Sequence, residues 1–494
     1  MHEVITVSFS QRSNHLATHL FNSQDGYLDY SRGASKSKVD PEVFFKPNVS
    51  ADGKSVSYTA RSLMWDAKDG FGAMGRHEYS ERADDGLDWS ERVEVVRAPR
   101  IPKNAYQQGL DELQRELPAL SINDTRYFTD YARTLYPPTG FNILNRWVLD
   151  GKDFGKCISQ ASEQVKFDEF GVGSEEWKNK GLGTDFMDEE FRHSLESCDL
   201  LSGLNVITDV DSAWGGFTSE FMADITDEFL PKTTTFVWGL YEDTQTNLLD
   251  SKRAMSRIQT TTELMKTASI YIPISTSGSG FRGVDGSSLW QVSAVQNIVV
   301  DSWATLLSQR DNRVSMADVE MGLTMGSHRT LVTDLRLKLS DSATVYNLSP
   351  QTLYLKPGKS WLQSTARQRT PHVFSRSVIA RSSFPENLKD QVEEFSELSN
   401  LCEYGTQMRG VVTYPSETPF QPPSSYPVGL VPPNGEVLTS LDVSDRAKVM
   451  LHSMKQIAQK RMKSSAVEEI VDDLETAKQD YEFGWDEGSD SYDE

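Results

Sequence analysis

The segment from residue 203 to residue 229 has the residue types of a strand, a glycine-containing turn and a helix, an arrangement that binds phosphate in many proteins. Such a turn needs converging backbone N–H groups and glycines that let the anion approach closely. Here the turn reads Asp211-Ser212-Ala213-Trp214-Gly215-Gly216-Phe217. Trp214 and Phe217 would crowd the anion, and the carboxylate of Asp211 would repel phosphate oxygens. An ordinary strand-to-helix turn with an aspartate or serine cap is the favoured interpretation, and the alternative is a damaged phosphate site.

Three other groups of residues could carry chemistry, and each has an ordinary structural alternative. The glycine-rich run 277–283 could hold an anion beside Arg282, but it lacks the ending of a P-loop, so we favour a flexible connection. His15 and His19 share one helix face, which permits metal binding, although helix packing or solvent exposure is favoured. Cys198 lies between acidic neighbours that raise a thiol pKa, and we interpret it as a packed helix residue.

The composition indicates a protein with well-formed cores and an excess of acidic groups. The chain has 494 residues, enough for two or three domains, and its 72 acidic and 50 basic residues give a formal net charge of −22. That balance argues against nucleic acid as a partner, because phosphate backbones are bound by Lys and Arg. Three widely spaced cysteines favour a reducing compartment over a disulfide framework or a thiolate metal site. No apolar run approaches about 18 residues, so we expect any membrane association to be peripheral.

The apolar pattern predicts an open α/β fold with a mainly parallel sheet. The N-terminal run alternates apolar side chains at Ile5, Val7 and Phe9, which indicates a strand rather than a cleaved presequence. Around the altered turn, a strand, a helix and a second strand follow one another as in a βαβ unit. The predicted strands are 3–9, 57–66, 203–208 and 235–240, and the predicted helices are 14–21, 107–117, 124–135, 188–199, 218–229 and 289–307.

The C-terminal third gives weaker signals. Residues 414–433 contain seven prolines and are typical of a linker or an extended surface segment. Residues 444–479 are predicted to form one long helix that changes from basic to acidic. Its basic part, from Lys455 to Lys463, could contact anionic lipid or an acidic partner, although a solvated helix face is the favoured interpretation. Residues 480–494 are predicted to be a disordered acidic tail.

Three segments resemble tubulin and occur in the tubulin order. Residues 1–15 are similar to the tubulin N-terminus M-R-E-I-V-H-I-Q-A-G-Q-C-G-N-Q. Residues 58–70 are similar to Y-V-P-R-A-V-L-V-D-L-E-P-G, and residues 196–205 to E-S-C-D-C-L-Q-G-F-Q, which precedes the G-G-G-T-G-S-G loop. The resemblance is closer to the Misato family of tubulin-like proteins, through residues 8–15, 66–72, 127–131 and 237–240, and it covers roughly residues 1–305.

The resemblance implies a nucleotide pocket that has lost several of its groups. Ser10 and Ser13 replace tubulin glycines, Lys68 replaces an acidic residue of the magnesium region, and Glu175 intrudes in the run 170–175 that is similar to the loop G-A-G-N-N. Trp290-Gln291 is similar to the Y-N pair beside the base. The residues implied to remain as a vestigial nucleotide pocket are Gln11, Asn14, Asp66, Gly171, Gly173, Gly215, Gly216 and Gln291.

A domain organisation is expected from the resemblance up to about residue 308 and from the residue patterns beyond it. We expect a Misato segment over 1–115, as the N-terminal part of a three-layer tubulin-like domain, and a nucleotide-binding-type domain over 116–308. A second α+β domain with the proline-rich segment is expected over 309–443, a C-terminal helix over 444–479 and the acidic tail over 480–494.

The function implied by the resemblance is that of a non-enzymatic tubulin-like protein. Four altered loops make GTP hydrolysis improbable, because phosphoryl transfer depends on a positioned metal and on backbone donors; we expect no catalytic residue, no bound metal and no required cofactor, and weak GTP binding stays open. The family implies a role in partitioning of mitochondria, in mitochondrial DNA inheritance and in mitochondrial distribution and morphology, at the outer surface of the mitochondrion and in the cytoplasm. Expected partners are proteins: tubulin, cytoskeletal or chaperonin components. The alternatives are a GTP-binding, self-assembling cytoskeletal protein and a purely structural adaptor.

Overall fold

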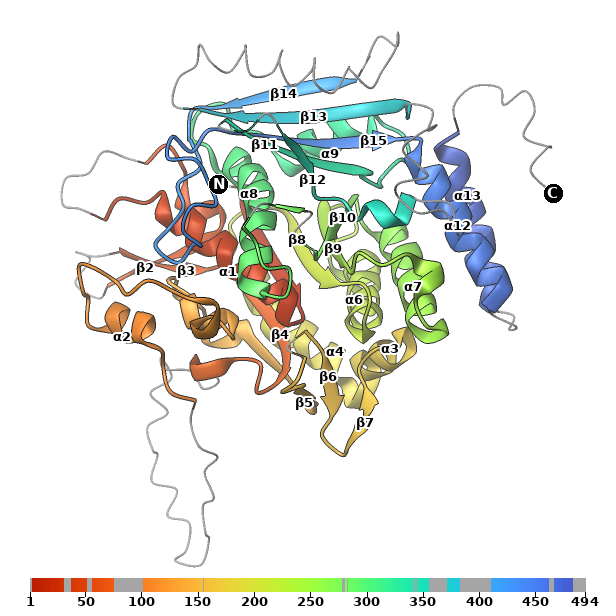
Figure 1. Ribbon diagram of the computed structural model, residues 1–494, viewed down its shortest axis with the longest axis horizontal. Coiled ribbons are helices and arrows are strands. Elements are labelled where there is room, and N and C mark those ends of the chain that lie inside the picture. The colour runs from red at the N-terminus through yellow and green to blue at the C-terminus, as the bar shows by residue number, and fades with distance from the viewer. Residues whose placement is uncertain are drawn as a thin grey trace, which may run out of the picture.

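The structure is a computed structural model, and it describes residues 2–30, 37–50, 56–74, 101–153, 155–277, 280–281, 283–340, 342, 344–354, 371–382, 410–461 and 466–482. Within these ranges the chain forms a large sheet with helices on its two faces and a smaller sheet that lies above it in Figure 1. The two C-terminal helices lie at one side of both sheets (Figure 1).

The large sheet has eight strands in the order β10-β9-β8-β1-β4-β5-β6-β7. The strands from β10 to β5 are parallel, whereas β6 and β7 are antiparallel additions at one edge. Parallel strands are covered on both faces, which explains the nearly continuous apolar runs of the central strands. The bounds are β1 Glu3–Phe9, β4 Ser62–Lys68, β5 Phe141–Leu149, β6 Cys157–Ser159, β7 Ser162–Lys166, β8 Leu201–Asp209, β9 Thr235–Tyr241 and β10 Ile270–Ser275.

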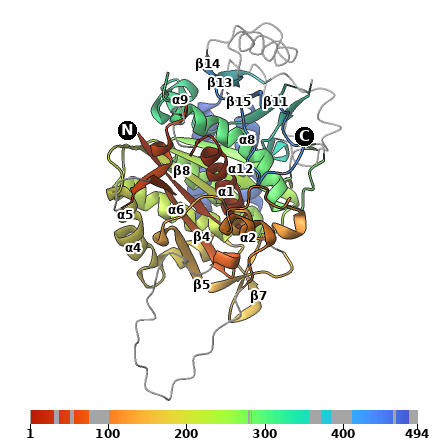
Figure 2. The same ribbon diagram turned by 90° about the vertical axis from the view of Figure 1, so that its left-hand side faces the viewer.

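Helices α1 and α8 pack together on one face of this sheet, and helices α3, α6 and α7 pack together on the other (Figures 1 and 2). Helix α8 is buried along nearly its whole length, as expected for a helix that is apolar on all sides. The bounds are α1 Gln11–Gly26, α2 Ala105–Asp111, α3 Phe170–Lys178, α4 Leu182–Phe186, α5 Arg192–Glu196, α6 Ala213–Asp224, α7 Ser251–Thr267 and α8 Leu289–Ser308.

The smaller sheet has five strands in the order β12-β11-β15-β13-β14, and a separate hairpin joins β2 to β3. The strands of the smaller sheet are antiparallel except for the parallel pair β13 and β14. The bounds are β2 Phe45–Val49, β3 Val56–Ala60, β11 Asp334–Leu339, β12 Val345–Asn347, β13 Val373–Arg381, β14 Val411–Ser416 and β15 Val437–Ser444, and those of the remaining helices are α9 Met316–Thr324, α12 Arg446–Arg461 and α13 Ala466–Asp480.

A buried polar triad joins the two sheets through helices α1 and α8. Arg381 of β13 donates to the carboxylate of Asp301 on α8 at 2.8 Å and to the hydroxyl of Tyr27 at 2.8 Å. Tyr27 in turn donates to Asp301 at 2.6 Å. Because breaking a buried ion pair leaves an uncompensated charge, this triad fixes the small sheet against the helices of the large one.

The structure confirms the elements with the strongest periodicity and corrects several others. The predicted strand 3–9 is β1, and the predicted helix 289–307 is α8 with one further residue. The predicted helix 124–135 is wrong, because this segment forms short 3₁₀ turns at Ile122–Asp124 and Phe128–Tyr131. The predicted strand 57–66 is two strands, of which β3 pairs with β2 and β4 joins the large sheet.

The C-terminal helix predicted over 444–479 is two helices that pack against each other. Lys455 of α12 pairs with Glu475 of α13 at 2.9 Å, and Lys448 pairs with Glu482 at 3.6 Å, so the helices are antiparallel. Arg461 donates to backbone carbonyls that precede α7. Part of the basic face suggested for lipid therefore serves intramolecular contacts; the acidic tail lies outside the described residues from 483 onward. In the described ranges, no helix combines the length and apolarity needed to span a membrane.

Candidate functional site

The carboxyl ends of β1, β4, β8 and β9 meet at one edge of the large sheet, the place where open α/β sheets bind ligands. The structure brings the residues predicted for a nucleotide pocket into two clusters near this edge and leaves one residue apart. Gln11, Asn14 and Asp66 form the first cluster, and the glycines of α3 and α6 form the second. Gln291 lies at the start of α8.

The first cluster is a closed hydrogen-bond network inside the protein. The amide of Asn14 donates to the backbone carbonyl of Trp65 at 3.0 Å and to the carboxylate of Asp66 at 3.1 Å. The amide of Gln11, with its nitrogen turned toward these groups, donates to the carbonyl of Gly70 at 3.1 Å and to Asp66. All three predicted residues are fully buried. The retained side chains therefore hold the β1–α1 turn against the end of β4.

Asp66 is a buried carboxylate that is surrounded by neutral donors. Burial raises its pKa to about 7, although hydrogen bonds from the backbone of Ala67 and from Asn14 act in the opposite direction. Lys68, which takes the place of an acidic residue in the resemblance to tubulin, is exposed at the end of β4. Across the described ranges, no group of three or more His, Cys, Asp and Glu side chains has the arrangement of a metal site.

The β1–α1 turn keeps a backbone conformation that normally requires glycine. Ser10 has φ 109° and ψ 158°, a region that residues with a side chain rarely adopt. Its hydroxyl accepts a hydrogen bond from the backbone of Ser13 at 3.2 Å and so caps α1. Such a conformation costs of the order of 1–3 kcal/mol and must be maintained by the surrounding packing. Ser10 therefore adopts a conformation that glycine adopts more readily, and its hydroxyl takes part in capping α1.

The second cluster consists of glycines that allow helices to touch. The run 170–175, interpreted above as a loop, begins helix α3 instead, and this correction changes the role of its glycines. A Cβ atom at Gly173 would overlap the carbonyl oxygen of Ala213, and one at Gly216 would overlap that of Phe170. Gly215 faces Thr260 of α7 in the same way, whereas Gly171 is exposed and meets nothing within 4 Å. Three of the four glycines predicted for the nucleotide pocket therefore serve helix packing.

The aromatic residues of the turn lie in the core and do not crowd a phosphate site. Trp214 and Phe217 are 1% and 0% exposed. The ring of Phe217 lies 4.8 Å from that of Trp177 and 5.1 Å from that of Trp65, and Trp214 packs on Phe167 at 5.2 Å. Edge-to-face contacts of this kind add to the free energy gained by burial. The expectation that Trp214 and Phe217 crowd a phosphate was wrong, because both side chains are buried among other aromatic residues, including Trp177 of α3.

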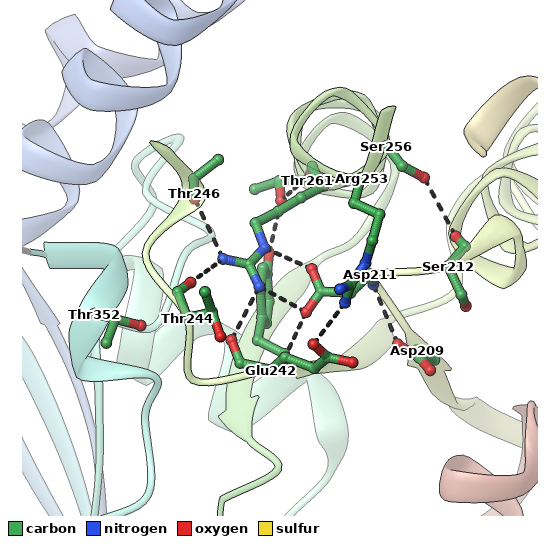
Figure 3. Close-up of polar contacts among 12 residues, drawn as sticks. Asp209, Asp211, Ser212, Glu242, Thr244, Thr246, Arg253, Ser256, Thr261 and Thr352 are labelled. Carbon is green, nitrogen blue, oxygen red and sulfur yellow. Dashed lines mark hydrogen bonds and ion pairs between the residues drawn. The ribbon is translucent and has the colours of Figure 1, made fainter. Parts of the chain in front are cut away.

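Asp211 has a buried partner that the sequence did not reveal. The two oxygens of the Asp211 carboxylate, which Figure 3 labels, accept from Nε and Nη2 of Arg257 on α7 at 2.5 and 2.7 Å. Both side chains are almost fully buried. Arg257 also donates to the carbonyl oxygens of Thr244 and Glu242. This bidentate pair is a strong and geometrically specific interaction. Asp211 is therefore neutralised by a fixed cation and does not present a free charge at the sheet edge.

A second set of ion pairs lies beside Asp211, at the ends of β8 and β9. Arg12 of α1 approaches Asp209 at 3.4 Å and Glu242 at 3.4 Å, and Arg253 of α7 approaches Glu242 at 2.5 Å. Burial raises the pKa of Asp209 to about 6, despite the opposing effect of Arg12. Burial also disfavours the charged form of Glu242, but Arg12 and Arg253 outweigh it and lower the pKa of this group.

A cavity of about 170 Å³ remains between these ion pairs and the start of α6. Pockets for small molecules and cofactors usually have volumes of about 300–1,000 Å³, so this space is too small for a nucleotide. Its walls are formed by Arg12, Gly155, Lys156, Cys157, Lys166, Phe167, Asp168, Asp209, Asp211, Ser212, Glu242, Asp250 and Arg253. The protein thus fills this edge of the sheet with charged groups of its own.

Of the two residues expected beside a nucleotide base, Trp290 is buried and Gln291 is half-buried. Trp290 is 3% exposed and donates from its indole N–H to the carbonyl of Ser425 at 3.0 Å. His19 bonds to the carbonyl of Trp290 at 3.0 Å and stacks on Tyr131 at 4.8 Å. The amide oxygen of Gln291 accepts from the backbone of Asp285 at 2.7 Å. Trp290 therefore has no open ring face, and burial lowers the pKa of His19 to about 3, which keeps it neutral.

Four residues of this edge were missed by the sequence interpretation: Arg12, Glu242, Arg253 and Arg257. One signal was present, because Asp209 directly follows one predicted strand and Glu242 lies two residues after another, and side chains at carboxyl ends of parallel strands gather at one edge. The two arginines of α7 share a helix face by their spacing of four residues. Their partners lie far away in the sequence, and no local pattern identifies them.

Comparisons with known proteins agree with this architecture. A model of the Misato segment II tubulin-like domain matches residues 2–112, and a model of a tubulin domain matches residues 117–310. Protein DML1 of Debaryomyces hansenii is 28% identical over 506 aligned residues, which cover all of both chains. Protein DML1 of Kluyveromyces lactis is 27% identical over 99% of each chain, and that of Scheffersomyces stipitis is 30% identical over 71% of this chain and 65% of that protein.

Proposed function

Because the chain belongs to the Misato family of tubulin-like proteins, we propose that it acts in the partitioning of mitochondria and in the inheritance of mitochondrial DNA, without hydrolysing a nucleotide. Control of mitochondrial distribution and morphology belongs to the same proposal. The mitochondrial part is supported by family resemblance, and the non-enzymatic part is supported by the geometry of the sheet edge.

The observation that carries the non-enzymatic part is the set of ion pairs at the carboxyl ends of β8 and β9. Phosphoryl transfer needs a metal ion and converging backbone donors around the phosphates. At this edge Asp211 is bound to Arg257, and Glu242 is bound to Arg12 and Arg253. Gly173 and Gly216 are occupied by the contact between α3 and α6. These contacts support a fold that is complete without a nucleotide.

In this proposal the tubulin-like fold works through its surface. We propose protein partners, with tubulin, other cytoskeletal proteins and chaperonin components as the candidates, and a place at the outer surface of the mitochondrion and in the cytoplasm. The net charge of −22 favours partners with basic surfaces and disfavours direct binding to DNA. Influence on mitochondrial DNA is therefore proposed to be indirect, through the distribution of the organelle.

Nucleotide binding is tested by titrating purified protein with GTP and Mg²⁺ in a calorimeter, with polymerising tubulin as the positive control. We expect no heat of binding above the dilution heat and no release of phosphate. Sedimentation in the presence and absence of GTP tests assembly in the same samples. Saturable GTP binding together with GTP-dependent pelleting would reject the non-enzymatic proposal in favour of a GTP-binding, self-assembling cytoskeletal protein.

The mitochondrial role is tested by conditional depletion of the protein in the cells that encode it. We expect loss of mitochondrial DNA from daughter cells and altered mitochondrial distribution, both restored by the wild-type chain. Crosslinking with purified tubulin and with purified chaperonin tests the candidate partners, and denatured protein serves as the control for non-specific capture. Depleted cells that keep normal mitochondrial DNA and morphology through many divisions would rule out the mitochondrial role.

A further inference from the structure

Glu242 occupies an unusual position, because its carboxylate lies between two arginines that come from different helices. Arg253 of α7 donates to Oε2 at 2.5 Å (Figure 3). Arg12 of α1 reaches Oε1 from Nη1 at 3.5 Å and from Nη2 at 3.4 Å. Each carboxylate oxygen thus faces one guanidinium group, as the oxygens of a bound phosphate or carboxylate ligand do.

The two arginines depend on Glu242 to different degrees. Among the described residues, Glu242 is the single carboxylate that pairs with Arg253. Arg12 has Asp209 as its other carboxylate partner, at 3.4 Å, and all of its contacts are long. Its side chain is 15% exposed and faces the 170 Å³ cavity. Removal of the Glu242 carboxylate would therefore leave one unpaired guanidinium and one weakly paired guanidinium at the wall of a cavity.

The remaining walls of this cavity carry groups that suit an anion and also the carboxylates of Asp168 and Asp250, which oppose one. Helix α6 begins at Ala213, and Ser212, which precedes it, lines the cavity. The buried hydroxyl of Ser212 has no hydrogen-bond partner in the described part of the chain. Lys156 and Lys166 also line the space. The volume is about five to six times the ~30 Å³ that a water molecule occupies in the liquid, which leaves room for a tetrahedral oxyanion.

We propose that Arg12, Arg253 and the hydroxyl of Ser212 form an oxyanion site whose resident anion is the side chain of Glu242. The carboxylate satisfies the arginines and at the same time disfavours phosphate, because it would repel at short range a second anion placed between the same two guanidinium groups. This inference deepens the proposed function, on which it rests, because it names the group that keeps nucleotide phosphates away from the sheet edge. Nucleotide phosphates are thus excluded by the repulsive carboxylate of Glu242 as well as by the small volume of the cavity.

The test is the substitution Glu242→Ala, with inorganic phosphate as the probe. Calorimetric titration at constant ionic strength, with chloride as the reference salt, measures phosphate binding to the variant and to the wild type. We expect the variant to bind phosphate at least about tenfold more tightly than the wild type, because a carboxylate that competes for both arginines is gone. Asp168→Ala is the matched control, since Asp168 lines the same cavity and forms no ion pair in the described ranges.

A second variant assigns the bound phosphate to this site. Glu242→Ala combined with Arg12→Ala is expected to lose the phosphate binding gained by Glu242→Ala. Should Glu242→Ala fail to fold in chloride, recovery of its native circular dichroism in phosphate is the supporting result, and the absence of recovery is the contradicting one. A folded Glu242→Ala variant that binds phosphate no better than the wild type overturns the inference. That result leaves the proposed function intact, since the latter is judged by GTP binding to the wild type.

Discussion

Replacing Asp211 with alanine should destabilise the protein strongly, because it removes the counter-charge of a fully buried arginine. Arg257 is 0% exposed and Asp211 is 1% exposed, and two short hydrogen bonds join them. Loss of one partner from a buried ion pair costs about 3–5 kcal/mol. The variant also loses the bond that the carboxylate accepts from the backbone N–H of Glu242 at 2.6 Å, which adds about 1 kcal/mol.

The expected loss is a large fraction of the total, since most proteins are stable by only about 5–15 kcal/mol. Urea unfolding followed by circular dichroism is the assay, because urea, unlike guanidinium chloride, does not add ions that screen the pair. Asp227→Ala removes an exposed carboxylate from the π-helical turn Ile225–Phe229, which follows α6, and serves as the control, with an expected change within about 0.5 kcal/mol.

A double variant separates the ion pair from other effects of the substitution. Asp211→Leu with Arg257→Met replaces both charges by apolar groups of similar size, and we expect it to be more stable than Asp211→Ala. An unfolding midpoint of Asp211→Ala equal to that of the wild type would refute the reasoning and would favour an open loop in which Asp211 merely repels phosphate. So would a gain of GTP binding by Asp211→Ala without loss of stability.

Three further predictions follow from contacts described above. Gly216→Ala should lower the free energy of unfolding by about 1–3 kcal/mol or more, because the new Cβ atom would overlap the backbone of Phe170. Gly171→Ala is the control and should change it by no more than about 0.5 kcal/mol, because a Cβ atom there meets nothing within 4 Å. Equal effects of the two substitutions in urea unfolding would contradict the packing role of Gly216. Asp66 has a folded pKa of about 7, above its unfolded value, so its contribution to stability is present below pH 4 and is lost as the pH rises to about 7. The stability of Asp66→Asn relative to the wild type should therefore rise between pH 4 and pH 7. A stability difference between the two proteins that does not change with pH would count against a buried carboxylate without a cationic partner. His15 and His19 have folded pKa values lowered to about 3, so the stability they contribute is present above about pH 6.5 and is lost as the pH falls toward 3. The double variant His15→Gln, His19→Gln should therefore lose less stability than the wild type between pH 6.5 and pH 3, as measured by thermal unfolding.

The sequence predicted those parts of the fold in which a local pattern decides the structure. Strand β1 and helix α8 appear at nearly the predicted residues, because alternation and continuous apolarity are properties of single segments. The segment 124–135 was assigned as a helix by its residue types, but the contact of Tyr131 with His15 and His19 holds it in short turns. Tertiary contacts of this kind cannot be read from one segment.

The candidate site was predicted in part, and the remainder depended on distant partners. Gln11, Asn14 and Asp66 do lie together at the sheet edge, as the resemblance to tubulin implied. The glycines were assigned to phosphate, whereas the structure uses Gly173 and Gly216 for the crossing of α3 and α6. A glycine that permits a close approach looks the same in sequence whether the approaching group is an anion or a helix. The pairing of Asp211 with Arg257 depends on how α7 packs, which no motif encodes.

The charged groups that Arg12, Arg253 and Arg257 bind are parts of the same polypeptide, and this has a consequence for how the protein can be regulated. A tubulin that hydrolyses GTP draws on chemical energy, which lets assembly and disassembly follow different routes in time. Under the proposed function this chain hydrolyses no nucleotide, so its associations with partners are reversible equilibria. Their direction would then be controlled by the concentrations of its partners and by competition among them.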